Sequence, residues 1–325
     1  MNWLITGGCG FIGLNLIRIL LKDKKNQIRV IDNLSISNNN DLQNISNFKE
    51  ISKDKIPNFD QDIQFIKGDI CDPLLAISAT KYADIIVNLA ANTGVQPSIE
   101  NPRKDCEVNI IGTLNYLEAA RVNKVKKFIL SSSSAAVGQK IPPINEEMPA
   151  KPLSPYGASK LAGEAYCSAY FTSFLVETVV LRFGNVYGPG SIYKESVIAK
   201  FIKKIIKNEV IEIYGDGEQT RDFIYIDDLV SAIILSATKD KIGGEVFQIA
   251  NNLEVTINEI LTMLKSYASN HIKNLIKIEY CGKRTGDIEK IYSDTSKARN
   301  ALNWEPKCSM NEGIENTFSY FLNNK

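Results

Sequence analysis

Residues 1–23 constrain the fold of this chain more than any other stretch. They read MNWLITGGCGFIGLNLIRILLKD: an apolar run ending at Thr6, a glycine-rich turn, and then apolar residues at helical spacing. A buried strand that passes through a glycine turn into an amphipathic helix begins a strand–helix–strand unit, and a second strand follows at QIRVIDN (27–33). The chain is therefore expected to start with two parallel strands joined by a helix.

The same rhythm continues through the first half of the sequence. Helices are expected notably around 104–123 and 156–171, and further apolar strands at IQFIKGDI, ADIIVNLAA, KKFILSSSS and VETVVLRFGNVYG. Because crossovers between parallel strands are right-handed, this alternation predicts an α/β fold with a doubly wound parallel sheet covered on both faces. The Asn- and Ser-rich stretch 34–60 is the least periodic part, and we interpret it as a loop with a weak helix.

After about residue 185 the regular alternation of strands and helices gives way to shorter elements and to turn sequences such as YGDGEQ and KIGGEV. The sequence therefore predicts two domains. The larger sheet domain covers residues 1–184, with 222–252 returning to it, and a smaller mixed α/β domain covers 185–325. A ligand is expected between the two.

Composition argues against several classes of function. Lys and Arg number 38 against 37 Asp and Glu, a net charge of +1, so neither a nucleic acid nor an anionic membrane is an expected partner. Six cysteines without a C-x-x-C pair and a single histidine, His271, argue against a metal site, a disulfide framework and a His-centred triad. No apolar run of about 18 residues and no signal peptide are present, so a cytoplasmic protein is expected.

The glycine turn has the chemistry of a dinucleotide site. Gly7, Gly10 and Gly13 stand in G-x-x-G-x-x-G spacing between strand and helix, which lets a pyrophosphate approach the backbone at the positive end of the helix dipole. Asp32 ends the second strand, where a carboxylate accepts hydrogen bonds from the adenosine ribose and repels a 2′-phosphate. NAD is therefore expected as the cofactor rather than NADP.

A second chemical signal lies in LSPYGASKLAGEAYCSAYF (153–171). Tyr156 and Lys160 are four residues apart on an expected helix and so share one face. An ammonium beside a phenol favours the phenolate, which lets a tyrosine act as a general base near neutral pH. Such pairs also occur by chance on helix surfaces, so the interpretation depends on the surrounding motifs.

Taken together, these motifs resemble those of the extended short-chain dehydrogenase/reductases. The resemblance is strongest to the NAD-dependent nucleotide-sugar epimerases and dehydratases, and among them to the UDP-glucose 4-epimerases. It runs nearly end to end, through TGGCGFIG, GDI, NLAA, VNIIGT, SSS, YGASK, RFGNVYGPG, GDGEQTRDFIYIDDL and RTGD. It implies a Rossmann domain that binds NAD, a smaller domain that binds a nucleotide sugar, and a homodimer packed through helices near 104–121 and 157–171.

The resemblance also assigns residues to the cofactor. Asp69 and Ile70 are expected against the adenine, Leu89 and Ala90 along the cofactor cleft, and Asn109 in the network that steadies the catalytic lysine. The full cofactor set that it implies is Gly7, Gly10, Phe11, Ile12, Gly13, Asp32, Asn33, Asp69, Ile70, Leu89, Ala90, Ala91, Asn109, Ser131, Tyr156 and Lys160.

YGASK fits the Tyr-x-x-x-Lys signature of the superfamily. The resemblance implies that Tyr156 exchanges a proton with a sugar hydroxyl, while Lys160 holds the nicotinamide ribose and lowers the pKa of the tyrosine. A serine is expected to complete the hydrogen-bond path. Counting back from Gly138 identifies Ser133, and the run of four serines leaves Ser134 as the alternative.

The sequence departs from the dehydratase pattern directly after this serine. The 4,6-dehydratases carry Asp-Glu there as the acid–base pair that expels water, whereas this chain has Ser134 and Ala135. Without the two carboxylates, elimination by that route lacks its proton donor. Val137 also replaces a tyrosine that relatives often carry. The sequence therefore argues against a 4,6-dehydratase.

The resemblance implies a substrate site in the second half of the chain. Asn185 is expected at the sugar diphosphate, and Arg221 and Arg284 are expected to grip it, since guanidinium forks meet phosphate oxygens in pairs. Asp287 is expected at the nucleotide ribose. The full substrate set that the resemblance implies is Thr93, Ser133, Asn185, Val197, Phe201, Tyr214, Arg221, Arg284 and Asp287, with Val197, Phe201 and Tyr214 around the uracil.

The leading hypothesis from the sequence is a UDP-hexose 4-epimerase. In this hypothesis Tyr156 takes the proton of the 4-hydroxyl, a hydride passes to the nicotinamide, and the 4-keto sugar turns and takes the hydride back on its other face. A 5,6-dehydratase or a 2-epimerase that shares the oxidation is the alternative. A non-enzymatic dinucleotide sensor is disfavoured, since such relatives usually lack the Tyr-Lys pair. The sugar stays open between glucose, N-acetylglucosamine and glucuronate types.

Overall fold

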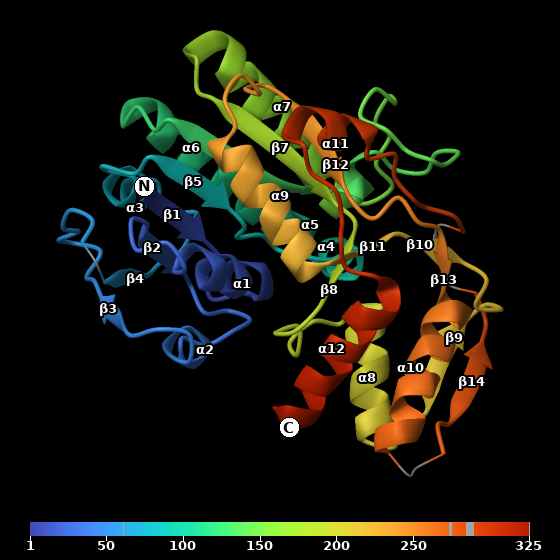
Figure 1. The fold of residues 1–325 in the computed structure, drawn as a ribbon. Coiled ribbons are helices and arrows are strands. Elements are labelled where there is room, and N and C mark those ends of the chain that lie inside the picture. The colour runs from blue at the N-terminus through green and yellow to red at the C-terminus, as the bar shows by residue number, and fades with distance from the viewer. Residues whose placement is uncertain (61, 273–274, 284–288, 325) are drawn as a thin grey trace. The chain divides into compact units, whose positions relative to one another are not determined.

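The structure is a computed structural model that describes residues 1–60, 62–272, 275–283 and 289–324. Its largest feature is an eight-stranded sheet with the strand order β12-β7-β6-β5-β1-β2-β4-β3 (Figure 1). The strands of this sheet are β1 (Asn2–Thr6), β2 (Gln27–Asp32), β3 (Phe48–Glu50), β4 (Ile63–Lys67), β5 (Ile85–Asn88), β6 (Lys127–Ser133), β7 (Thr178–Phe183) and β12 (Val246–Ile249).

The chain winds outward from β1 in both directions. β2 and β5 both pair with β1 in parallel, and β4 and β6 extend the sheet in parallel on either side. The strand residues are nearly all buried, which explains why these strands appear in the sequence as continuous apolar runs rather than alternating patterns. The predicted doubly wound α/β fold is confirmed.

The stretch 34–60 differs from its prediction as a loop with a weak helix. It contains the short helix α2 (Asn40–Gln43), and it also contains β3, which pairs in parallel with β4 at the edge of the sheet. Two of the three β3 side chains are exposed, so the sequence of the strand has no apolar run from which a strand could be predicted. The ring of Phe48 meets that of Phe65 edge-on at 5.4 Å, which anchors the strand.

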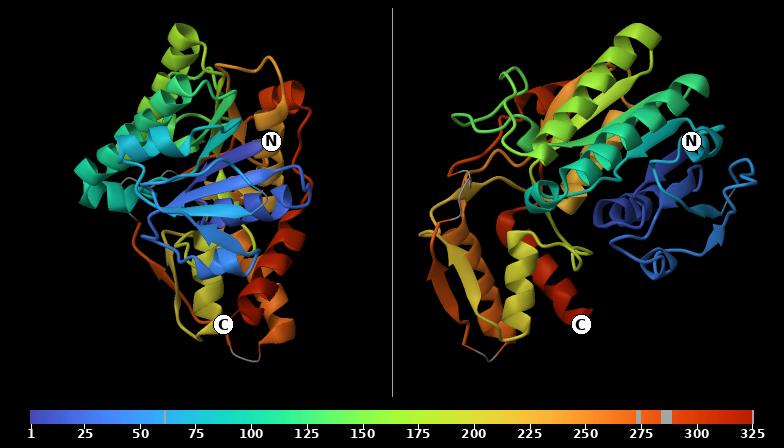
Figure 2. Two further views of the ribbon diagram at one scale, coloured as in Figure 1. Left: turned by 90° about the vertical axis from the view of Figure 1, so that its left-hand side faces the viewer. Right: turned by 180° about the vertical axis from the view of Figure 1, so that it is seen from behind.

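Helices cover both faces of the sheet (Figure 2). One face carries α1 (Phe11–Leu20) and α9 (Ile226–Thr238), and the other carries α3 (Pro73–Ala79), α6 (Gly112–Val122) and α7 (Pro155–Phe174). Buried apolar side chains of the second group of helices pack on the strands, among them Tyr116 and Leu117 against Ile86 and Phe128. This packing fixes α7, the helix of the Tyr-Lys pair, on the sheet.

Between β5 and α6 the chain forms an irregular helical segment. It consists of α4 (Val95–Glu100), α5 (Pro102–Cys106) and a π-helical turn (Glu107–Ile111) that runs directly into α6. Asn101 caps α5 by accepting a hydrogen bond from the Lys104 N–H, and Pro102 occupies the first helical position. A π-helical turn inside a helix is rare and often marks a functional site.

The chain divides into two compact units. Unit 1 comprises residues 1–138, 149–182 and 230–247, and unit 2 comprises 139–148, 183–229 and 248–325. Unit 2 contains short paired strands and four further helices among its described residues. Its elements are β8 (Asn185–Tyr187), α8 (Val197–Ile206), β9 (Ile211–Tyr214), β10 (Thr220–Arg221), β11 (Phe223–Tyr225), β13 (Val255–Thr256), α10 (Ile257–His271), β14 (Ile278–Cys281), α11 (Ser296–Leu302) and α12 (Met310–Asn323).

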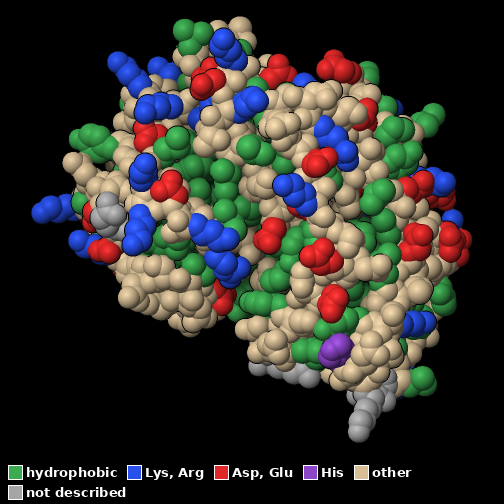
Figure 3. All heavy atoms as spheres, in the orientation of Figure 1, with side chains coloured by type: hydrophobic (Ala, Val, Ile, Leu, Met, Phe, Trp, Pro, Cys, Tyr) green, Lys and Arg blue, Asp and Glu red, His purple; other side chains and the backbone are tan. Residues whose placement is uncertain are grey.

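The face of the molecule in Figure 3 carries no dominant charge of one sign. Acidic and basic side chains are interspersed over the face in Figure 3. Within the described ranges, no helix has the length and apolar composition that crossing a lipid bilayer requires. The same part of the chain contains no group of three or more His, Cys, Asp or Glu side chains that could hold a metal ion.

Candidate active site

The glycine-rich turn connects β1 to α1. Gly7 has φ +67°, and a Cβ atom there would lie 2.8 Å from the Ala90 nitrogen. A Cβ atom on Gly13 would lie 2.5 Å from the Gly8 Cα, so both positions require glycine. Gly10 is the N-cap of α1 and provides no side-chain cap, which leaves the first N–H groups of the helix for another acceptor. The turn therefore fits the pyrophosphate of a dinucleotide.

Asp32 lies against this turn at the end of β2. Its Oδ2 accepts a hydrogen bond from the Cys9 N–H at 3.0 Å, and its Oδ1 accepts one from the Leu34 N–H at 2.8 Å. Burial raises the pKa of Asp32, while these two hydrogen bonds act in the opposite direction. The carboxylate is thus held beside the glycine turn, at the position where an adenosine ribose would hydrogen-bond to it.

A second acidic group follows β4. The Asn33 Nδ2 donates to Asp69 Oδ2 at 3.0 Å, which ties the end of β2 to the end of β4. Burial acts to raise the pKa of Asp69, but hydrogen bonds from Cys71 and Asn33 hold it below its usual value. Ile70 is buried beside it.

The predicted cofactor residues gather at one edge of the sheet. They follow the carboxyl ends of neighbouring strands: the glycines after β1, Asp32 and Asn33 at β2, Asp69 and Ile70 after β4, and Leu89, Ala90 and Ala91 after β5; Ser131 lies within β6. The chain leaves β1 and β5 in opposite directions across the sheet, and this topological switch point is where ligands bind in doubly wound folds. The Leu89 N–H donates to the Thr6 carbonyl at 3.2 Å, which keeps the two strand ends together.

The start of α7 is fixed by its own sequence. The Ser154 side chain accepts a hydrogen bond from the Gly157 N–H at 3.1 Å, and Pro155 takes the first helical position. Tyr156 therefore lies in the first turn and Lys160 one turn later. The Lys160 Nζ lies 5.8 Å from the centre of the Tyr156 ring.

The three predicted catalytic residues come together in unit 1. The Ser133 side chain, at the end of β6, hydrogen-bonds the Tyr156 side chain. The Lys160 Nζ donates to the Ser131 carbonyl at 2.9 Å. Ser134 instead begins a short 3₁₀ turn (Ser134–Ala136), and this contact of Tyr156 favours Ser133 over Ser134.

The pKa of Tyr156 differs from its prediction. Burial raises it to about 12, although the hydrogen bond from Ser133 acts to lower it. Burial also lowers the pKa of Lys160 to about 8. The expected lowering of the tyrosine pKa by Lys160 is not seen in this structure, because a buried phenolate is poorly solvated and the Lys160 ammonium donates to a carbonyl instead.

Asn109 lies in the π-helical turn and connects several segments. Its Oδ1 accepts a hydrogen bond from the Asn92 N–H at 2.8 Å, and its Nδ2 lies 3.1 Å from the Asn92 carbonyl. The same Nδ2 lies 3.0 Å from both the Asp105 carboxylate and the Ser159 Oγ. Sequence reasoning missed Asp105 and Ser159. Asp105 could have been found from the sequence, because it stands four residues before Asn109 and so lies on the same face of a helix.

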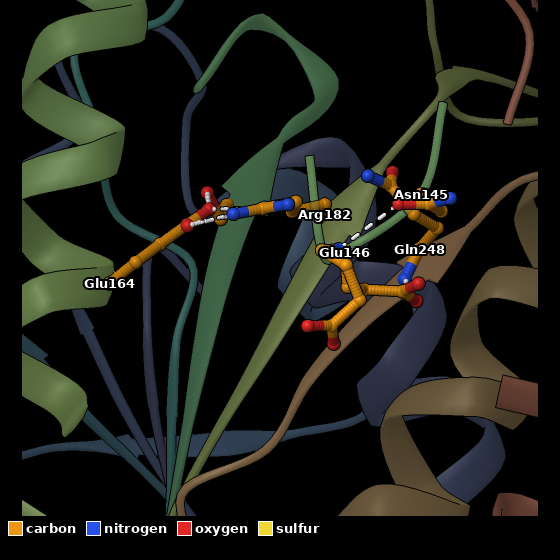
Figure 4. A network of polar contacts seen from close by, with 7 residues as sticks. Asn145, Glu146, Glu164, Arg182 and Gln248 are labelled. Carbon is orange, nitrogen blue, oxygen red and sulfur yellow. Dashed lines mark hydrogen bonds and ion pairs between the residues drawn. The ribbon is translucent and has the colours of Figure 1, made fainter. Parts of the chain in front are cut away.

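A buried ion pair ties α7 to β7. The Arg182 guanidinium contacts the Glu164 carboxylate through Nε and Nη2, at 3.0 and 2.7 Å (Figure 4). The Ser132 Oγ donates to the same carboxylate at 2.5 Å. The side chains of Arg182 and Glu164 are only 6% and 5% exposed. Sequence reasoning also missed this pair, whose signal was the position of Glu164 four residues after Lys160.

The predicted substrate residues are distributed over both units. Thr93 follows β5, and with Ser133 it belongs to unit 1. In unit 2, β8 pairs with β11, and Asn185 lies opposite Phe223 in this pairing. Phe223 is two residues after Arg221 in the sequence. Both the backbone N–H and the Nδ2 of Asn185 donate to the Asp222 carbonyl, at 2.8 and 3.4 Å.

The remaining substrate predictions are less concentrated. Val197 and Phe201 lie on α8, and Phe201 is only 4% exposed, within the apolar core of unit 2. Tyr214 ends β9. Arg284 and Asp287 lie outside the described residues.

Comparison with known proteins agrees with the motifs. The chain matches the family described as GDP-mannose 4,6 dehydratase over residues 4–317. It is 33% identical to a putative UDP-glucose 4-epimerase of Methanocaldococcus jannaschii, over 99% of this chain and 98% of that protein. Among solved structures, it is similar to a UDP-glucose 4-epimerase of Thermotoga maritima with UDP-glucose, with 33% identity, a TM-score of 0.87, and 100% and 99% of the two chains covered.

A second solved structure contains a cofactor. It is a UDP-glucuronic acid 4-epimerase of Bacillus cereus in complex with UDP-glucuronic acid and NAD, with 29% identity, a TM-score of 0.88, and 100% of both chains covered. The family match and the identities extend over nearly the whole chain. The chain therefore belongs to this family of nucleotide-sugar epimerases and dehydratases within the extended short-chain dehydrogenase/reductases, as its motifs predicted.

Proposed function

We propose that this protein is an NAD-dependent nucleotide-sugar epimerase that interconverts the 4-epimers of a UDP-hexose. The observation that carries the proposal is the group of Ser133, Tyr156 and Lys160 in the unit that also holds the glycine turn and Asp32. The solved relatives, a UDP-glucose 4-epimerase and a UDP-glucuronic acid 4-epimerase with NAD, support the reaction and the cofactor.

The chemistry follows from the positions of the side chains. NAD, when bound, supplies the acceptor and then the donor of a hydride. Burial disfavours the Tyr156 phenolate, but the positive charge of a bound oxidised nicotinamide would favour it. The phenolate oxygen would then take the proton of the sugar 4-hydroxyl as carbon 4 is oxidised, so that a 4-keto sugar forms. Ser133 hydrogen-bonds the tyrosine and the reacting oxygen, and Lys160 holds the nicotinamide ribose. After the sugar has turned, Tyr156 would return the proton as carbon 4 is reduced on its other face, so nothing would be consumed.

The segment after Ser133 supports epimerisation over elimination of water. Ser134 and Ala135 lie in the 3₁₀ turn of this chain, at the two positions where the 4,6-dehydratase sequence pattern has Asp-Glu. Ser134 is 9% exposed, and neither residue can act as the acid that protonates a leaving hydroxide. A 5,6-dehydratase or a 2-epimerase that uses the same oxidation is the second candidate.

The two compact units suggest that cofactor and substrate are bound by different parts of the chain. In this proposal unit 1 binds NAD, while unit 2 binds the nucleotide sugar. Asn185 and Arg221 hold the diphosphate together with Arg284, and Asp287 takes the nucleotide ribose. The uracil lies among three further residues of unit 2, namely Val197, Phe201 and Tyr214.

The assembly and location are also proposals. Helices α6 and α7 lie side by side in unit 1 and expose apolar side chains, among them Val122, Tyr166 and Phe174 at 50%, 40% and 49%. Two copies that pack these helices together would form a homodimer. A cytoplasmic location fits a nucleotide-sugar substrate and six free cysteines.

The first test is an NMR time course in deuterated water without added oxidant. The purified protein receives UDP-glucose, UDP-N-acetylglucosamine or UDP-glucuronate, and Tyr156→Phe is the matched control. We expect one 4-epimer to appear without deuterium on carbon, since the hydride returns directly. Loss of water, or deuterium at carbon 5, would show a dehydratase instead. No conversion of any sugar by protein that releases NAD on denaturation would refute the proposed substrate class.

A further inference from the structure

One buried carboxylate near the catalytic group has no role in the reaction described above. Asp105 lies in α5, one residue before its end, with 1% of its surface exposed. Its Oδ1 accepts hydrogen bonds from the Nδ2 atoms of Asn109 and Asn92, at 3.0 and 3.5 Å. Its Oδ2 is buried and has no hydrogen-bond partner within the described residues. A carboxylate oxygen left in this state is costly, so a function is expected to offset it.

The Oδ1 of Asp105 orients the amide of Asn109. A carboxylate accepts hydrogen bonds only, so it selects the NH₂ end of the amide and turns the amide oxygen toward the Asn92 N–H. The same NH₂ group reaches the Ser159 Oγ at 3.0 Å, and that hydroxyl donates to the Tyr156 carbonyl at 3.0 Å. A continuous chain of hydrogen bonds thus connects Asp105 to the backbone of the catalytic tyrosine.

Asp105 also acts on the catalytic pair through its charge. Its negative charge raises the pKa of both Tyr156 and Lys160, and Glu164 of α7 raises that of Lys160 in the same way. Glu164, however, is already paired with Arg182 (Figure 4). Asp105 forms no ion pair with a described Lys or Arg.

The other elements around the pair contribute little charge. The carboxylates of Glu100 on α4 and Glu107 in the π-helical turn belong to exposed residues. The β6 residues that touch the pair, Ser131 and Ser133, are uncharged. Asp105 therefore carries the unpaired buried charge that acts on the catalytic side chains.

We propose that Asp105 is a positioning residue of this active site, which holds the first turn of α7 through Asn109 and serves as the buried counter-charge of Lys160. It acts through other residues and is not itself a proton donor to substrate. The part that concerns Lys160 does not depend on the proposed function, whereas the effect on turnover rests on it.

The primary test is a titration that needs no turnover. The Lys160 side chain is followed by ¹³C NMR in protein labelled at lysine Cε, and the signal is assigned by its loss in Lys160→Arg. Asp105→Asn keeps the shape of the side chain and an acceptor for Asn109 but removes the charge. Since the charge of Asp105 favours the ammonium, we expect the Lys160 midpoint to fall from about 8 by roughly 0.5 to 1 pH unit. Glu107→Gln removes an exposed charge from the π-helical turn that also carries Asn109, and it is expected to leave the midpoint in place.

The second test uses the reaction. In Asp105→Asn both limbs of the pH profile of kcat/KM are expected to move toward lower pH, because the midpoints of Tyr156 and Lys160 both fall. Asp105→Ala also removes the acceptor for Asn109, and we expect kcat to fall about 10- to 100-fold with a smaller change in KM. Circular dichroism verifies that each variant is folded.

The outcomes separate the two proposals. An unchanged Lys160 midpoint in folded Asp105→Asn would overturn the counter-charge. Parent-like kcat in folded Asp105→Ala would overturn the positioning role. An inactive parent whose Lys160 midpoint still moves would refute the proposed substrate and leave the assignment of Asp105 supported.

Discussion

The buried ion pair between Glu164 and Arg182 gives a prediction whose size follows from the structure. Both side chains are about 95% buried, and the guanidinium meets the carboxylate in a fork at 3.0 and 2.7 Å. Arg182→Leu removes the cation and leaves the Glu164 charge in an apolar interior. The Ser132 hydroxyl still donates to it, but one neutral hydrogen bond cannot replace a bidentate cation. We expect the free energy of unfolding to fall by about 3–5 kcal/mol.

The assay is urea unfolding at pH 7, followed by circular dichroism. Lys126→Ala is the matched control, because Lys126 also pairs with a carboxylate, that of Asp84 at 2.7 Å, but is 78% exposed. That change should lower the free energy of unfolding by less than about 1 kcal/mol.

A double variant tests the cause of the loss. Arg182→Leu combined with Glu164→Leu removes both charges, so no uncompensated charge remains in the interior. We expect it to be more stable than Arg182→Leu alone, although the Ser132 hydroxyl loses its acceptor. The reasoning fails if Arg182→Leu costs no more than the surface control, or if the double variant is less stable than the single one.

Three further outcomes are expected. Gly157→Ala places a Cβ atom 2.4 Å from the Ala135 carbonyl oxygen, so α7 shifts away from the 3₁₀ turn that follows Ser133. Steady-state kinetics should then show kcat about 10- to 100-fold lower. Gly7→Ala should yield protein with little bound NAD, measured by releasing the nucleotide on denaturation, since its Cβ would meet Ala90. Because the pKa of Lys160 is about 8, its ammonium is lost as pH rises through that value, while the Tyr156 phenolate still becomes more abundant, so kcat/KM should stop rising above about pH 8. In Lys160→Arg, which stays charged throughout, the rise with pH should continue.

The strands of the sheet were predictable because burial on both faces leaves continuous apolar runs, such as IIVN of β5. β3 was not predictable for the opposite reason. Its sequence FKE exposes two of three side chains, and its existence depends on pairing with β4, which is a tertiary interaction. The assignment of residues 139–148 to unit 2 likewise depends on contacts distant in sequence, including the Gln248 N–H that donates to Glu146 Oε1.

The site was predictable where its chemistry is local. The glycine spacing and the Tyr-x-x-x-Lys spacing are properties of one turn and one helix. Arg182 escaped prediction because its partner, Glu164 on another element, is defined by packing. Asp105 is only four residues from Asn109, but its burial within a segment of exposed neighbours also depends on packing. The raised pKa of Tyr156 was not predicted for a related reason. It is caused mainly by burial, and the Tyr-x-x-x-Lys spacing does not show how deeply the tyrosine is buried.

One short segment nevertheless specifies both the chemistry and the geometry of the site. In SPYGASKLAGE, the serine and proline fix the residue at which α7 begins, and so place Tyr156 in its first turn. Gly157 then allows the helix to approach the 3₁₀ turn that follows Ser133, at a distance that no side chain would permit. Glu164 anchors the same helix to β7 two turns later. A Tyr-Lys pair four residues apart is common, but one flanked by a helix start, a close approach and a buried anchor is held in a single position relative to its serine. The flanking residues, more than the pair itself, therefore distinguish a catalytic helix from a surface helix.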